Sequence, residues 1–136
     1  MTDNHELAGE SLTGVWHGQY AYPMLLEPVH FVATIIDSGG MLSGTIVETT
    51  NLPGQGPQQR EASLDGARQG GEAHFLKVYM PASEDHQDVI YFGQISADRT
   101  EIDGEWLIPG SWAGRFLMIR SRGSEVAEER RESLQV

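Results

Sequence analysis

The sequence predicts an all-β protein, an eight-stranded antiparallel up-and-down β-barrel, and three observations lead to this prediction. Runs of residues typical of strands alternate between polar and apolar side chains. Turn-forming residues separate these runs at regular intervals, as in a meander. No segment before the C-terminal tail repeats its apolar residues with a helical period. A meander of about eight strands closes well into a barrel, and closure removes the exposed edges of an open sheet.

The first expected strand, residues 12–22, places glycine and aromatic residues at every second position. One face of this extended segment carries Gly14, Trp16, Gly18, Tyr20 and Tyr22, and the other carries Val15, His17, Gln19 and Ala21. Glycine on an inner face permits the sharp coiling of a small barrel and leaves space beside it. We therefore expect the glycine-rich face to line a lumen that has room for a ligand.

Trp16 is interpreted as a structural residue, because an indole near the start of the first strand has the size to plug the closed end. The last strand of an up-and-down barrel lies beside the first. We therefore expect the guanidinium of Arg115 or Arg120 to lie over the Trp16 ring.

Seven further strands are expected at residues 29–37, 41–50, 60–67, 72–80, 88–96, 101–108 and 112–121. Turn signals stand between them at Asp37-Ser38-Gly39-Gly40, Gly70-Gly71, Pro81-Ala82-Ser83-Glu84-Asp85, Ala97-Asp98-Arg99 and Pro109-Gly110. The segment 49–60, TTNLPGQGPQQR, is too long and too rich in proline and glycine for a tight hairpin. We expect a loop there, at the mouth of the barrel, that is either a lid or a plain connection.

The 136 residues, 39% of them hydrophobic, fit a single folded domain. We expect a flexible N-terminal segment at 1–11, the barrel at 12–121 and a charged C-terminal tail at 122–136. The tail mixes both signs of charge with few apolar residues, so it is expected to be disordered or a short helix.

Composition excludes several classes of function. Cysteine is absent, which rules out disulfides, thiolate metal sites and cysteine nucleophiles. The net charge of −11 argues against nucleic acid and anionic membranes as partners. The opening MTDNHELAGESL lacks the pattern of a secretory signal, and no apolar run approaches the roughly 20 residues of a membrane span, so we expect a cytoplasmic location.

Four short segments resemble the avidin and streptavidin family, within the calycin group that includes the lipocalins. They are Leu12-Thr13-Gly14-Val15-Trp16, Gly40-Met41-Leu42-Ser43-Gly44-Thr45, Tyr91-Phe92-Gly93-Gln94-Ile95 and Asp103-Gly104-Glu105-Trp106-Leu107-Ile108. The resemblance covers most of residues 12–121 and implies an avidin- or lipocalin-like barrel. Because subunits of that family associate through their barrel walls, it also implies a homo-oligomer.

The residues that contact biotin in that family mostly do not carry over. Gly18 stands where the family has an asparagine, and Ile46 and Glu48 stand where it has a tyrosine and a serine. Tyr91 falls near the position of its sixth-strand tryptophan, whereas Trp106 matches a biotin-contacting tryptophan. Most donors to the ureido oxygen are therefore missing, and we expect a ligand other than biotin.

A second resemblance involves haem barrels. The segment from Gly14 to Gly18, followed by Tyr22-Pro23, resembles the opening of the nitrobindin-like haem barrels. Those barrels need an axial histidine near the end of the chain, and no histidine follows His86 here. We therefore expect no haem, and no other cofactor is expected.

The predicted ligand-binding residues are those that the alternation turns toward the lumen: Tyr20, Tyr22, Ile46, Glu48, Tyr91 and Trp106. Glu48 is the candidate for polar orientation of a ligand, since an inward carboxylate must be paired, hydrated or protonated. Its place near a strand end also suits a wet mouth. We assign no catalytic residue, and Glu48 is the only candidate.

The leading hypothesis is a binding protein that holds a partly apolar or aromatic small molecule without changing it covalently. Two alternatives stay open. One is an enzyme of isomerase or cyclase type with Glu48 as acid or base, and the other is a packed barrel without a ligand whose outer surface forms oligomers. The histidines His5, His17, His30, His74 and His86 show no metal-ligand spacing, so no metal site is expected.

Overall fold

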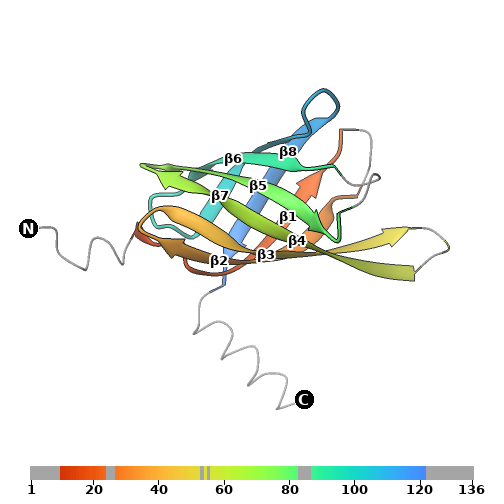
Figure 1. Cartoon of the computed structure of the whole chain (residues 1–136), viewed down its shortest axis with the longest axis horizontal. Coiled ribbons are helices and arrows are strands. Elements are labelled where there is room, and N and C mark those ends of the chain that lie inside the picture. The colour runs from red at the N-terminus through yellow and green to blue at the C-terminus, as the bar shows by residue number, and fades with distance from the viewer. Residues whose placement is uncertain (1–9, 24–26, 53, 55, 83–86, 122–136) are drawn as a thin grey trace, which may run out of the picture.

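The described residues form one closed β-barrel. The computed structural model describes residues 10–23, 27–52, 54, 56–82 and 87–121 of the chain. Within these ranges, eight antiparallel strands follow one another around the barrel, and each pairs with its neighbours in sequence (Figure 1). The first strand, β1 (Gly14–Ala21), also pairs with the last, β8 (Ala113–Arg120). The predicted fold class, an eight-stranded up-and-down barrel, is confirmed.

The other strands are β2 (Val29–Ser38), β3 (Met41–Leu52), β4 (Gly56–Gln69), β5 (Glu72–Met80), β6 (Val89–Ile95) and β7 (Glu101–Leu107). Residues 1–9 of the expected N-terminal segment lie outside the described ranges. The whole expected tail, residues 122–136, and residues 83–85 of the expected turn at 81–85 lie outside them as well.

The expected loop at residues 49–60 is wrong, because β3 and β4 continue through most of it as a paired hairpin. Asn51 pairs with Pro57 and Leu52 with Gly56, so the two strands extend beyond the barrel (Figure 1). Pro57 is tolerated there because β4 pairs with β5 only from Glu61 onward. The proline therefore lies on an edge, where a missing N–H breaks no ladder.

Alternation in β1 follows the prediction. Trp16, Gly18 and Tyr20 are buried, whereas His17 and Gln19 between them are exposed. The inner face of the barrel forms one continuous apolar core, made of side chains from all eight strands and from Leu12.

The space beside the inner glycines is filled by neighbouring side chains, which corrects the expectation that it is left for a ligand. A Cβ atom on Gly18 would lie 2.2 Å from the Phe31 ring, and one on Gly114 would lie 2.6 Å from the Trp106 ring. Gly93 is approached in the same way by side chains of Ile102 and Phe116. The glycines thus admit aromatic rings into the core of a narrow barrel.

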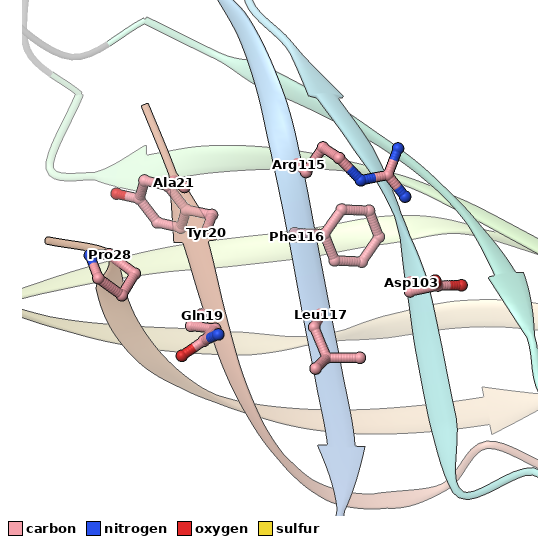
Figure 2. Close-up of a pocket in the computed structure, with 8 residues that line it drawn as sticks. All are labelled: Gln19, Tyr20, Ala21, Pro28, Asp103, Arg115, Phe116 and Leu117. Carbon is pink, nitrogen blue, oxygen red and sulfur yellow. The ribbon is translucent and has the colours of Figure 1, made fainter. Parts of the chain in front are cut away.

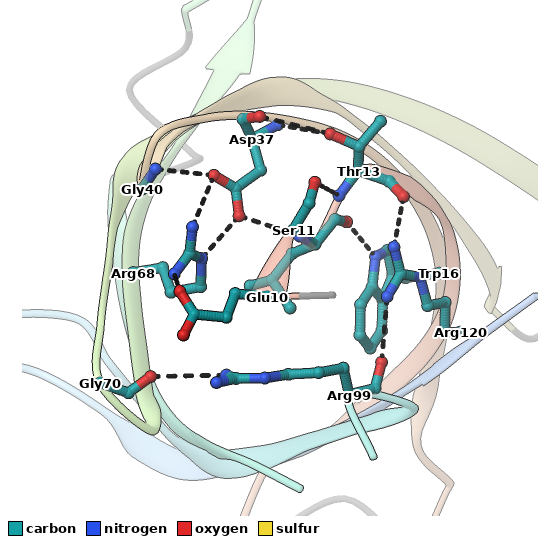
Figure 3. A network of polar contacts seen from close by, with 11 residues as sticks. Glu10, Ser11, Thr13, Trp16, Asp37, Gly40, Arg68, Gly70, Arg99 and Arg120 are labelled. Carbon is teal, nitrogen blue, oxygen red and sulfur yellow. Dashed lines mark hydrogen bonds and ion pairs between the residues drawn. The ribbon is translucent and has the colours of Figure 1, made fainter. Parts of the chain in front are cut away.

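Trp16 plugs one end of the barrel, as predicted. Its side chain is fully buried, and its indole N–H donates a hydrogen bond of 2.9 Å to the carbonyl of Leu12. The Arg120 guanidinium lies over the ring, 5.4 Å from its centroid, and donates to the carbonyls of Thr13 and Arg99 (Figure 3). Arg115 does not take this place, because it lies on the outer wall.

A second polar group closes the same end around Asp37. Its carboxylate accepts hydrogen bonds from the backbone N–H groups of Leu12 and Gly40 and from the guanidinium of Arg68 (Figure 3). Burial acts to raise the pKa of Asp37, but the bonds from Arg68 and the two N–H groups outweigh it and hold this pKa below its ordinary value. The closed end is therefore tied together by Trp16 and Asp37.

Candidate functional site

A buried ion pair lies in the half of the lumen opposite the Trp16 plug. Glu48 comes from β3 and Lys77 from β5, and the Lys77 ammonium donates a hydrogen bond to Glu48 Oε2. Their side chains are 2% and 1% exposed. Ala62 of β4, the strand between them, also points inward, and its small side chain leaves room for the pair to meet.

Tyr79 completes the polar group. Its hydroxyl donates to Glu48, with oxygen–oxygen distances of 2.9 Å to Oε1 and 3.2 Å to Oε2. Both carboxylate oxygens of Glu48 therefore already accept hydrogen bonds, one of them from a cation. This arrangement satisfies a carboxylate that would otherwise be costly to bury.

Aromatic rings surround the Lys77 ammonium. Its nitrogen lies 4.6 Å from the ring centroid of Tyr79, 4.7 Å from that of Tyr20 and 5.4 Å from that of Tyr91. The negative faces of these rings stabilise the cation in a place that water does not reach. Burial nevertheless lowers the pKa of Lys77, and the charge of Glu48 opposes that shift without cancelling it.

An aromatic wall continues from this polar group toward the mouth. The Tyr20 ring meets Trp106 edge to face at 6.0 Å, and the Tyr22 ring meets Trp106 at 4.9 Å. The indole N–H of Trp106 is fixed by a 3.1 Å bond to the carbonyl of Ala21. Burial, followed by the nearby charge of Glu48, raises the pKa of Tyr20, Tyr79 and Tyr91, and burial also raises that of Tyr22.

The mouth is lined by side chains that are only partly buried. Tyr22, Tyr79 and Ile108 pack against the core but retain some exposure. Two polar groups join them from the inner face of the β3–β4 hairpin, Thr50 and Arg60. The hydroxyl oxygen of Thr50 is buried and finds no hydrogen-bond partner among the described residues.

The structure brings together five of the six predicted site residues, namely Tyr20, Tyr22, Glu48, Tyr91 and Trp106. Glu48 is 1% exposed, so it lies inside the lumen and not at a wet mouth. The sixth residue, Ile46, also points inward, but it comes two residues before Glu48 on β3 and therefore lies nearer the Trp16 plug.

Sequence reasoning missed Lys77, Tyr79, Thr50 and Arg60. The signal for the first two was present, because Phe75 at an inward position places residues 77 and 79 on the same face of β5.

The described histidines lie outside the lumen. His17, His30 and His74 are exposed, as expected for His17, while His5 and His86 lie outside the described residues. Within the part of the chain that the structure covers, no three histidine or acidic side chains are grouped as a metal site would require.

An open depression of about 250 Å³ lies on the outer wall, over β1 and β8 (Figure 2). The outward residues Gln19 and Ala21 border it on one strand, and Arg115 and Leu117 border it on the other. Its lining shares Tyr20 with the predicted site, but the polar group of Glu48 and Lys77 does not contribute to it.

Searches of the sequence against protein-family models and against curated proteins found no match. The barrel agrees with the fold that the avidin and lipocalin resemblance implies, whereas membership of that family stays a prediction. Among the residues that the structure describes, we find no helical segment with the length and hydropathy that crossing a bilayer requires.

Proposed function

We propose that this barrel binds a small, partly aromatic molecule in the mouth half of its lumen, without changing it covalently. The observation that carries the proposal is the buried pair of Glu48 and Lys77, bonded to Tyr79 and enclosed by aromatic rings. Buried ion pairs contribute little net stability compared with apolar side chains of the same volume. A barrel that served only as a packed scaffold has no need of one at its centre.

The surroundings of the pair support a ligand with an aromatic body. Tyr22 and Tyr79 each have one part packed on the core and another part exposed at the mouth. Trp106 lies beside Tyr22 and is held in place by its bond to Ala21. Fixed aromatic walls with a few polar groups are typical of small-molecule sites.

The proposal does not extend to catalysis. An acid or base must be within reach of its substrate, whereas the Glu48 side chain is 2% exposed and its carboxylate is already held by hydrogen bonds from Lys77 and Tyr79. We therefore favour a binding role for Glu48, in which it fixes the positions of Lys77 and Tyr79.

We further propose an avidin- or lipocalin-like relationship, a cytoplasmic location and a homo-oligomer that associates through the barrel walls. The absence of cysteine suits a reducing compartment. Outward Leu76, Ile90 and Leu107 occupy paired positions on β5, β6 and β7 and are each 38–45% exposed, which suits contact between copies.

The binding proposal is tested by isothermal titration calorimetry with three matched probes: naphthylacetate, naphthylethanol and naphthylethylamine. We expect saturable binding of at least one probe, weakened about 10-fold or more by Tyr22→Ala, which removes an aromatic contact. Leu117→Ala on the outer wall is the matched control and should leave binding unchanged. The proposal would be overturned if none of the three probes bound, or if Leu117→Ala lost binding while Tyr22→Ala kept it.

A further inference from the structure

We infer that the ligand is an organic anion, a carboxylate on an aromatic body, and that Arg60 and Thr50 bind its charged group at the mouth. This inference rests on the proposed function and names the class of ligand.

Arg60 lies at the inner rim and has no counter-ion within the described part of the chain. It is half-buried on β4 between the exposed Gln59 and Glu61, so it has the inward position of the alternation. Among the described residues it forms no ion pair, whereas Arg68 and Arg115 each pair with a carboxylate. The charge of Arg60 also acts on the Tyr22 hydroxyl and lowers its pKa, against the larger effect of burial. The Arg60 guanidinium therefore lies near the Tyr22 hydroxyl.

Glu48 does not neutralise Arg60, although the two residues are partners across β3 and β4. The carboxylate of Glu48 is already neutralised by Lys77, and its oxygens accept bonds from Lys77 and Tyr79. Among the residues that the structure describes, the inward-facing groups of the mouth half thus keep one unbalanced positive charge, in a chain whose net charge is −11. A cation without a partner attracts an anionic group locally, against the long-range field of an acidic chain.

Thr50 supplies a second, independent observation. Its hydroxyl is buried and has no partner among the described residues, which is a costly state for a polar group. Thr50 pairs with Gln58, two residues from Arg60 along β4, so Thr50 and Arg60 are diagonal neighbours on the inner face. A carboxylate between them accepts one bond from the hydroxyl and others from the planar guanidinium.

The aromatic body of the ligand then lies against the wall next to these groups. Tyr22, Trp106 and Ile108 form that wall, and each is part of the apolar core or packed against it. The charged group remains at the rim, where water still reaches it, while the apolar part is removed from water. This orientation avoids the cost of burying the carboxylate.

The test compares the same three naphthyl probes by isothermal titration calorimetry; they share the aromatic body and end in a carboxylate, a hydroxyl or an ammonium group. We expect the full chain to bind naphthylacetate about 10-fold more tightly than naphthylethanol, and naphthylethylamine most weakly. Arg60→Gln should abolish the preference for the acid and leave the affinity for naphthylethanol within about twofold. Thr50→Val should weaken naphthylacetate about fivefold or more.

Matched controls are Arg115→Gln and Thr45→Val, which change the same residue types on the outer wall and should leave all affinities unchanged. Thermal unfolding followed by circular dichroism verifies that each variant is folded. Equal affinity for the acid and the alcohol, or a preference that survives Arg60→Gln, would overturn the inference while the proposed function stands. If none of the probes binds, both are overturned.

Discussion

Replacing Lys77 with methionine should destabilise the barrel far more than replacing both members of its ion pair. Lys77→Met leaves the Glu48 carboxylate in a place where its side chain is 2% exposed, so water cannot replace the lost cation. Breaking a buried pair in this way costs about 3–5 kcal/mol of the free energy of unfolding. The double change Glu48→Met with Lys77→Met removes both charges and conserves volume. Its stability should lie within about 2 kcal/mol of the original, or above it.

Urea unfolding of the original protein, Glu48→Met, Lys77→Met and the double variant forms a double-mutant cycle. It gives the coupling free energy between the two positions. The matched control is Glu105 with Arg115 on the outer wall, whose side chains are 74% and 67% exposed at a nitrogen–oxygen distance of 3.6 Å. Exposed pairs of this kind contribute about 0–1 kcal/mol. If the double methionine variant loses as much stability as both single variants together, the coupling free energy is zero and the reasoning is refuted, because removing the second charge would then not relieve the cost of leaving the first one unpaired.

Three further predictions concern the rest of the barrel. Gly18→Ala places a methyl group 2.2 Å from the Phe31 ring and should lower the free energy of unfolding in urea by about 1–3 kcal/mol. Adding Phe31→Leu should restore part of this stability. An unchanged unfolding midpoint in Gly18→Ala would contradict this packing. Asp37→Asn should cost about 3 kcal/mol. Because folding lowers the pKa of Asp37, its contribution to stability is present above the ordinary value of 3.8 and is lost as pH falls below that value. Asp37→Asn should therefore lose less stability than the original protein on acidification. Burial raises the pKa of all four tyrosines, so the folded state binds their protons more tightly, and the tyrosine contribution to stability should be lost only as pH rises above 10.0. Absorbance near 295 nm should therefore show no phenolate before the barrel unfolds. Ionisation of a tyrosine in the folded barrel would count against the buried lumen.

Alternation along single strands predicted much of the site. The pattern around Trp16 placed Tyr20 inside, and the same period in β3 placed Glu48 there, because neighbouring side chains of a strand point to opposite faces. The period in β5 placed Lys77 inside equally well. Lysine is almost never fully buried without a partner, however, and the partner became visible only once β3 and β5 were brought together around Ala62.

Other features depend on three-dimensional packing that no strand pattern contains. The missing side chain of Gly18 predicts free space inside the barrel. The rotamer of Phe31, on the neighbouring strand, decides whether that space is empty. The segment 49–60 has the proline and glycine content of a loop, yet its proline lies on an edge where a strand tolerates it. Thr50 and Arg60 became candidates only after this hairpin was recognised.

The most direct test of the account is a crystal structure of the full chain grown with naphthylacetate. The account predicts the naphthyl rings inside the mouth half of the lumen, beside Tyr22 and Trp106, and the carboxylate within hydrogen-bond distance of Arg60 and Thr50. A probe seated in the outer depression beside Gln19 and Leu117 instead, or an unchanged mouth with no bound probe, would contradict it.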